Sequence, residues 1–325
     1  MHNRNMFILV VSMLLFISFS ASASALIMSG IHDEPVRVSV VLDDSGSERW
    51  SAFLAGLEQA GKDTGIRVSV VTTGKNTSIS QQYAIVREEI ASGAEGIILQ
   101  VTNSEGTEEM ISDISSKAVL ELVDTSASMD VDVEGKSACI EADNREVGRA
   151  LANEVRIALG RDLTGVRIGI VDSNRRKNSN IERMEGFMEN IESSGAVIAW
   201  KEYSKANIAD NISQKQQGRY ADVIVALDNT GLEAAGEYAS SVDNAPFIFG
   251  EGISIINVSY LDHGLIRSMI VPNEYYMGYQ SLATVKKRME NRLTPMENEY
   301  VTFRVVNKDN LFDEVNQRML FPVLQ

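Results

Sequence analysis

The sequence has little cysteine, histidine or basic charge. One cysteine, Cys139, and three histidines occur in 325 residues. A single cysteine cannot form an internal disulfide, and the scattered histidines do not have the spacing of metal ligands, so we predict no metal site and no cofactor. The 30 Lys and Arg stand against 45 Asp and Glu, a formal net charge of −15. This balance argues against a nucleic-acid partner, because binding phosphates needs a basic face.

Familiar catalytic motifs are also missing. The sequence has no G-x-S-x-G, Walker A loop, H-E-x-x-H or G-x-G-x-x-G. We therefore predict that the protein is not an enzyme. The weaker alternative is a glycosidase whose acid and base are carboxylates at strand ends, and binding without turnover would distinguish the two.

The long hydrophobic run lies at the N-terminus, from Met6 to Phe19, between a basic start and a stretch of small residues. Ala23 and Ala25 form an A-x-A-like cleavage site, so residues 1–30 are typical of an export signal. Counted to Met28, the stretch is also long enough to be an uncleaved membrane anchor. Both interpretations stay open. In either case the rest of the chain is extracytoplasmic and meets the membrane only through this segment.

After Pro35, short β-branched strands alternate with helices whose apolar residues recur every three or four positions, as in Phe53, Leu57 and Ala60. This alternation predicts βαβ units and an α/β fold with parallel sheets. It occurs in two halves with a junction near 138–145, and a last section, 266–306, is shared between them. The predicted strands are 36–42, 66–73, 95–101, 118–124, 166–172, 197–203, 222–228, 245–251, 266–272 and 300–306.

Several predicted strands end in a carboxylate. These strand ends are Asp43–Asp44, Asp124, Asp172, Asp228–Asn229 and Glu251. One such residue alone would be a helix cap or a turn former. Because ligands of open α/β sheets lie at the carboxyl ends of the strands, the set favours a cleft that accepts hydrogen bonds from hydroxyl groups.

The sequence resembles the type I periplasmic binding proteins of the sugar-binding group over roughly residues 36–310. The resemblance is carried by pieces in the family's order, among them VVLDDSGSERWSAFLAG, EEIASGAEGIILQVTNSEG, ADNREVGRALANEV and VIVALDNTGLEAAGEY. It implies two Rossmann-like lobes with parallel sheets, joined by a three-strand hinge at which Asn144 and Pro272 lie. Lobe 1 would comprise 36–143 and 272–303, and lobe 2 would comprise 144–271 and 304–325.

The resemblance also implies a set of ligand-binding residues. Trp50 would stack on a sugar ring, although it could instead merely cover the edge of the sheet. Arg49 occupies the family's other aromatic position. The polar residues expected to bind hydroxyl groups are Asp44, Ser47, Asp124, Asp228, Asn229 and Glu251.

Two positions depart from the family pattern. Ile181 replaces the ligand-binding arginine of the R-x-R-x-x-G-F motif, and Pro272 stands where the family often has Gln or Asn. We expect Arg175, in the basic loop before Ile181, to take over the missing role. Two alternatives stay open: an arginine of this loop binds an acidic or phosphorylated sugar, or the loop is simply solvated.

The resemblance implies an extracytoplasmic solute-binding protein that presents a sugar or a similar polyol to the permease of an ABC transporter. The alternative is a membrane-tethered sensor that reports its ligand to a sensor kinase. Repressors that share the fold are excluded, because they need a basic DNA-binding headpiece and this chain has an export segment instead.

Overall fold

The computed structural model describes residues 36–44, 46–74, 77–127, 137–291 and 293–322. The chain divides into Met1–Val36 and Arg37–Gln325, and the second part carries the fold. The predicted export segment, residues 1–30, lies outside the described residues. Within the described part, no helix is both long and apolar enough to cross a membrane.

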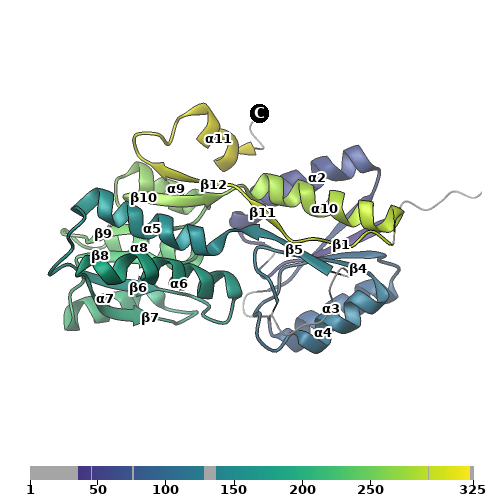
Figure 1. Cartoon of the computed structure of the whole chain (residues 1–325), viewed down its shortest axis with the longest axis horizontal. Helices are drawn as coiled ribbons and strands as arrows, with labels where there is room; N and C mark the ends of the chain where they lie inside the picture. The colour runs from purple at the N-terminus through teal and green to yellow at the C-terminus, as the bar shows by residue number, and fades with distance from the viewer. Residues whose placement is uncertain (1–35, 45, 75–76, 128–136, 292, 323–325) are drawn as a thin grey trace, which may run out of the picture. The chain divides into compact units, whose positions relative to one another are not determined.

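Two six-stranded sheets organise the second part (Figure 1). The first has the order β11-β5-β4-β3-β1-β2 and the second the order β12-β10-β9-β8-β6-β7. The pairings are parallel except for the antiparallel pair β10–β12. The strands are β1 (Arg37–Val41), β2 (Arg67–Val71), β3 (Gly96–Leu99), β4 (Val119–Val123), β5 (Ser137–Ala142), β6 (Arg167–Val171), β7 (Val197–Glu202), β8 (Val223–Ala226), β9 (Phe247–Glu251), β10 (Ser268–Pro272), β11 (Glu299–Val301) and β12 (Phe303–Asn307).

Helices cover both faces of each sheet. We call the first sheet and its helices lobe 1, and the second sheet and its helices lobe 2. Lobe 1 contains η1 (Glu48–Trp50), α2 (Ser51–Thr64), α3 (Ile79–Ala91), α4 (Glu108–Lys117) and α10 (Glu274–Glu290). Lobe 2 contains α5 (Asn144–Leu159), α6 (Asn178–Ile191), η2 (Glu192–Ser194), α7 (Ile208–Gly218), α8 (Asn229–Ser240), α9 (Ile255–Asp262) and α11 (Glu314–Leu320).

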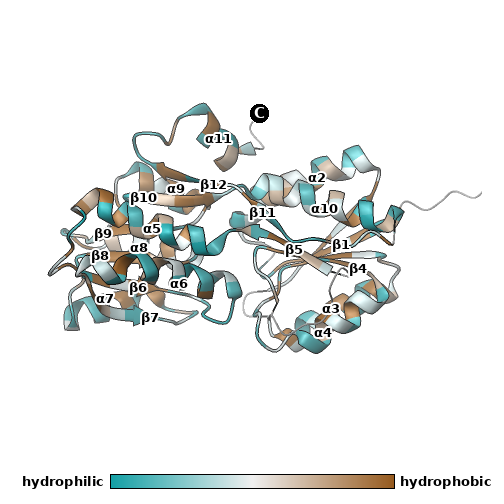
Figure 2. Cartoon of the chain, in the orientation of Figure 1, coloured by the Kyte–Doolittle hydropathy of each residue, from teal (hydrophilic) through white to brown (hydrophobic). Residues whose placement is uncertain are grey.

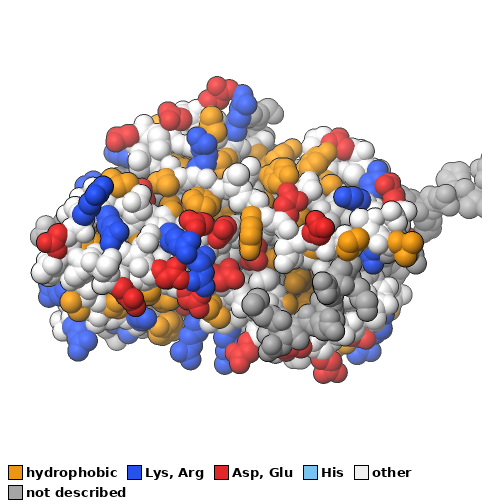
Figure 3. Space-filling model, in the orientation of Figure 1, with side chains coloured by type: hydrophobic (Ala, Val, Ile, Leu, Met, Phe, Trp, Pro, Cys, Tyr) orange, Lys and Arg blue, Asp and Glu red, His pale blue; other side chains and the backbone are white. Residues whose placement is uncertain are grey.

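The strand sequences explain this layering. Every residue of β3, GIIL, is buried, because a parallel sheet covered on both faces needs apolar side chains on both. Strand β2, at the sheet edge, is partly exposed. Figure 2 shows hydrophobic residues along the strands and hydrophilic residues on the outward turns of the helices. On the face shown in Figure 3, acidic and basic side chains lie together over α5 and α6, where Arg145 and Arg149 both pair with Glu189.

Glycines allow the central helices of lobe 1 to touch. A Cβ atom on Gly56 of α2 would lie 2.0 Å from the Tyr275 carbonyl oxygen of α10, and one on Gly278 of α10 would lie 2.0 Å from the Phe53 carbonyl oxygen. Gly65 ends α2 in the left-handed conformation, with φ 70°. The two helices therefore pack backbone to backbone beside the sheet.

The chain passes between the sheets at three points, near Asp143, Asn273 and Thr302. The backbone N–H of Asn273 donates to the Thr302 carbonyl oxygen at 2.9 Å, so two of the crossings are bonded to each other. The predicted hinge residues Asn144 and Pro272 each lie next to a crossing.

The structure differs from the expected elements in several places: helices α9 and α11 were not predicted, and two strands differ. The predicted strand 300–306 is two strands of different sheets, with the change at Thr302, so Phe303 lies in the sheet of lobe 2 rather than in lobe 1. Strand β5, SACIEA, was not predicted, because its serine, cysteine and glutamate break the β-branched pattern although most of its residues are buried.

Candidate functional site

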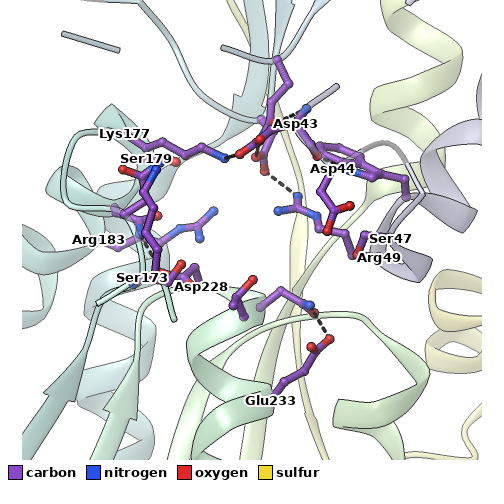
Figure 4. Close-up of a pocket in the computed structure, with 18 residues that line it drawn as sticks. Asp43, Asp44, Ser47, Arg49, Ser173, Lys177, Ser179, Arg183, Asp228 and Glu233 are labelled. Atoms are coloured by element: carbon purple, nitrogen blue, oxygen red, sulfur yellow. Dashed lines mark hydrogen bonds and ion pairs between the residues drawn. The ribbon is translucent and has the colours of Figure 1, made fainter. Parts of the chain in front are cut away.

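A cavity of about 230 Å³ lies at the carboxyl ends of the strands and takes its walls from both lobes (Figure 4). Its lining is almost entirely polar, with Trp50 as the aromatic exception. Lobe 1 contributes Asp43, Asp44, Ser47, Arg49, Trp50, Gln100 and Asp124; lobe 2 contributes Ser173, Asn174, Lys177, Ser179, Asn180, Arg183, Lys205, Asp228, Asn229, Thr230 and Glu233.

The turn after β1 places Trp50 in the wall but leaves almost none of its surface free. Trp50 is 1% exposed. Its indole Nε1 donates to the Asp43 carbonyl oxygen at 3.1 Å, and its ring packs edge to face on Phe53. The Arg49 guanidinium lies 4.1 Å from the centroid of the Trp50 ring. The Arg49 guanidinium thus covers the Trp50 ring, which we predicted would stack on a sugar. Trp50 also packs against the protein interior through Phe53.

Two carboxylates hold Arg49 in this position. Its Nη2 donates to Asp124 Oδ1 at 3.0 Å and to Glu274 Oε1 at 3.2 Å. Glu274 is fully buried at the start of α10, directly after a crossing between the lobes. Burial raises the pKa of Glu274 to about 8, against the lowering effect of Arg49. Its second oxygen, Oε2, has no hydrogen-bond partner among the described residues.

Asp124 is a carboxylate that interacts electrostatically with several cations of the cavity. It has φ 66°, a left-handed backbone that turns its side chain away from the line of β4. Its Oδ2 accepts from Gln100 Nε2 at 2.6 Å. Burial would raise its pKa, but Arg49, Lys177 and Arg183 outweigh that effect and lower the pKa to about 2. Asp124 is therefore ionised at neutral pH.

Asp228 has the same place in lobe 2, after β8. Its Oδ1 accepts from the Gly231 backbone N–H and caps α8, and its Oδ2 accepts from the Ser173 N–H and from Asn180 Nδ2, all at 2.8 Å. Asp172 shares the same Asn180 amide at 2.8 Å. Burial, together with the charge of Asp228, raises the pKa of Asp172 to about 6.

Asn229 lines the cavity, but its side chain is already engaged. Its Oδ1 accepts from the backbone N–H of Ile253 and of Ser254, at 3.0 and 3.1 Å. Its Nδ2 donates to Glu233 Oε1 at 2.8 Å. Asn229 therefore holds the loop after β9 and orients Glu233 toward the cavity.

The structure places two of the predicted residues outside the wall. Glu251 is 2% exposed and lies behind Arg183, whose Nη1 donates to Glu251 Oε2 at 2.8 Å. Arg175 is exposed, with its guanidinium 5.3 Å from the Tyr203 ring centroid. The basic residue that this loop brings to the cavity is Lys177, whose Nζ lies 3.6 Å from Asp43 Oδ2 and whose pKa is lowered by burial.

The loop 173–179 of lobe 2 also bonds directly to lobe 1. Asn174 Nδ2 donates to the Thr102 carbonyl oxygen at 2.7 Å. The backbone N–H of Asn178 donates to Ser104 Oγ, and that of Ser104 donates to the Arg176 carbonyl oxygen, both at 2.8 Å. These bonds lie away from the crossings, so the conformation described is one in which the lobes meet around the cavity.

Several lining residues were not among the predicted ones. Gln100 directly follows the buried strand β3, and this position could have identified it as a lining residue from the sequence. Lys177 and Asn180 lie in or just beyond the basic loop, but the sequence does not show which of its side chains turns inward. Glu233 lies four residues after Asn229 on α8, where helical spacing places it on the same face.

Residues 38–292 match the family model described as a periplasmic binding protein domain. The chain belongs to the periplasmic binding protein family. No curated protein matches the chain.

Solved structures of this fold include a carbohydrate transporter solute-binding protein from Agrobacterium radiobacter in complex with D-arabinose. It is 18% identical with TM-score 0.79, covering 88% of this chain and 99% of that one. A solute-binding protein from Agrobacterium vitis with bound D-fucose is 16% identical with TM-score 0.80, covering 88% and 100%. A chain of the XylFII-LytSN complex is 19% identical with TM-score 0.73, covering 85% and 98%. These likenesses establish the α/β fold with two parallel-dominant sheets.

Proposed function

We propose that this chain is an extracytoplasmic solute-binding protein that holds a sugar or a similar polyol in the cavity between its lobes, without chemical turnover, and presents it to an ABC transporter. The observation that carries the proposal is the composition of the wall. Carboxylate acceptors such as Asp124 and Asp228 alternate there with basic donors such as Arg49, Lys177 and Arg183.

This alternation suits hydroxyl groups. A hydroxyl both donates and accepts a hydrogen bond, so a polyol can satisfy carboxylates and cations of the wall at the same time. A cavity of about 230 Å³ lies below the range of sites for drug-sized ligands and suits a small molecule. Since the wall comes from both lobes, a ligand that contacts both favours the arrangement in which they meet.

The comparisons support the same ligand class. Two solved structures of this fold were determined with bound sugars, one with D-arabinose and one with D-fucose. Membership of the periplasmic binding protein family supports a location outside the cytoplasm. The second candidate function is a tethered ligand sensor that feeds a sensor kinase. It is favoured by the similarity to a chain solved within the XylFII-LytSN complex.

A thermal-shift screen of the full chain tests the proposal. The panel would contain pentoses, hexoses, inositols and their charged derivatives. A ligand that binds only the folded protein raises the melting midpoint by mass action. We expect at least one compound to raise it by several degrees and to be recovered chemically unchanged. A flat response across the panel, or conversion of the bound compound, would contradict the proposal.

A further inference from the structure

The charges around the cavity do not balance. Among the described residues, the wall carries five carboxylates, from Asp43, Asp44, Asp124, Asp228 and Glu233, and four cations, from Arg49, Lys177, Arg183 and Lys205. Further carboxylates, among them Asp172, Glu251 and Glu274, lie directly behind the wall and are almost completely buried.

The buried cations are already paired. Arg49 pairs with Asp124 at 3.0 Å and with Glu274 at 3.2 Å. Arg183 pairs with Glu251 at 2.8 Å, and Lys177 with Asp43 at 3.6 Å.

The fourth cation, that of Lys205, is exposed and makes no ion pair with a described residue. On the acidic side, Asp44, Asp228 and Glu233 make no ion pair with any residue that the structure describes. Negative charge is therefore in excess within the wall.

Glu251 and Glu274, which lie behind the wall, also have shifted pKa values, and burial is the main cause. Burial raises the pKa of Glu251, and that of Glu274 to about 8, although each is bonded to an arginine. The arginines therefore do not fully offset the cost of burying these two carboxyl groups.

Two carboxylates are placed to receive a positive group. Asp44 follows β1 in lobe 1, and Glu233 lies on the first turns of α8 in lobe 2; both are half-buried and line the cavity (Figure 4). Glu233 Oε1 accepts a hydrogen bond from Asn229 Nδ2, which fixes the side chain, while Glu233 Oε2 accepts none from the described residues.

We propose that the preferred ligand is a polyhydroxylated amine, an amino sugar being the simplest case, whose ammonium group lies between Asp44 and Glu233. The hydroxyl groups then meet the alternating donors and acceptors deeper in the cavity. An anionic ligand would instead add charge of the sign already in excess, and charge complementarity of this kind sets specificity. The inference rests on the proposed function and narrows its ligand class.

The test is calorimetric titration of the full chain at pH 6 with matched sugars. The set is D-glucosamine, D-glucose and D-glucuronate, and the same trio in the galactose series. We expect the protonated amino sugar of at least one series to bind about tenfold or more tightly than its neutral parent, and the acid to bind more weakly than either. Equal or tighter binding of the neutral or acidic member overturns this inference and leaves the proposed function standing. Failure of every member to bind overturns this inference, and the proposed function falls with it only if the whole thermal-shift panel is also flat.

Two variants locate the ammonium group. Glu233→Gln removes the charge but keeps an oxygen for Asn229, and Asp44→Asn suits the left-handed backbone at φ 49°. Each should reduce the preference for the amine over its neutral parent about tenfold, measured as the ratio of the two dissociation constants in the same variant. Glu237→Gln makes the same charge change one turn later on α8, outside the cavity, and should have no effect. An unchanged preference in both cavity variants would overturn the assignment.

Discussion

Replacing Arg183 with methionine removes the cation that compensates Glu251 inside lobe 2. Arg183 is 3% exposed. Its Nε donates to Asn144 Oδ1 at 2.9 Å, and its Nη1 donates to the Leu227 carbonyl oxygen and to Glu251 Oε2, both at 2.8 Å. The substitution keeps a long side chain in place but leaves all three acceptors without this donor.

The expected cost follows from these contacts. Breaking a buried ion pair from one side costs about 3–5 kcal/mol, because the remaining charge stays buried without a partner. Removing both charges, in Arg183→Met with Glu251→Gln, should cost less than the sum of the single substitutions. The difference between that sum and the cost of the double substitution is the interaction energy of the pair, which a double-mutant cycle measures.

The cost should also depend on pH. Burial raises the pKa of Glu251 in the folded protein, and loss of Arg183 removes a charge that opposes this. In the folded variant, Glu251 then stays protonated at a pH at which the same carboxyl group is ionised in the unfolded chain. Stability of Arg183→Met relative to the wild type should therefore fall further as pH rises past the raised pKa of Glu251 in the folded wild type toward neutrality.

Urea unfolding followed by circular dichroism measures these differences. The matched control is Arg149→Met, whose ion pairs with Glu146 and Glu189 are exposed and should leave the midpoint nearly unchanged. A cost below about 1 kcal/mol for Arg183→Met, or strictly additive single and double substitutions, would refute the reasoning.

Three other predictions concern the loop, a helix contact and a buried acid. Lys177→Gln should weaken binding of whichever sugar binds, whereas Arg175→Gln in the same loop should not, as calorimetric titration would show. Gly56→Ala should destabilise lobe 1, since its Cβ would meet backbone at 2.0 Å, while Gly61→Ala, with its nearest contact at 3.4 Å, should be tolerated; thermal unfolding compares them. Burial raises the pKa of Glu141 to about 8, so stability should decline as pH rises from about 4.5 to 8, and Glu141→Gln should flatten that decline in unfolding experiments repeated across this range.

The alternation of strands and helices could be predicted because its periodicity is local. Asp124 and Asp228 could be predicted for a similar reason: each lies within two residues of the end of a buried strand, and parallel strands bring their carboxyl ends together. Strand β5 escaped prediction because its buried Glu141 and Cys139 are stabilised by tertiary contacts rather than by local pattern.

Side-chain direction within loops could not be predicted. Arg175 and Lys177 are equally basic, and only the bonds of loop 173–179 to lobe 1 turn Lys177 toward the cavity. Glu251 ends its strand as expected, but Arg183 lies between it and the cavity. The position of Arg49 over Trp50 depends on Glu274, 225 residues away in sequence.

The measurement that tests the central claim most directly is hydrogen–deuterium exchange of the full chain with and without a sugar from the panel. Binding between the lobes predicts slower exchange in both walls, around 43–50 and 100–125 in lobe 1 and around 173–183 and 228–233 in lobe 2. Protection confined to one lobe, or no change with any sugar of the panel, would contradict the claim that a polyol is held in this cavity.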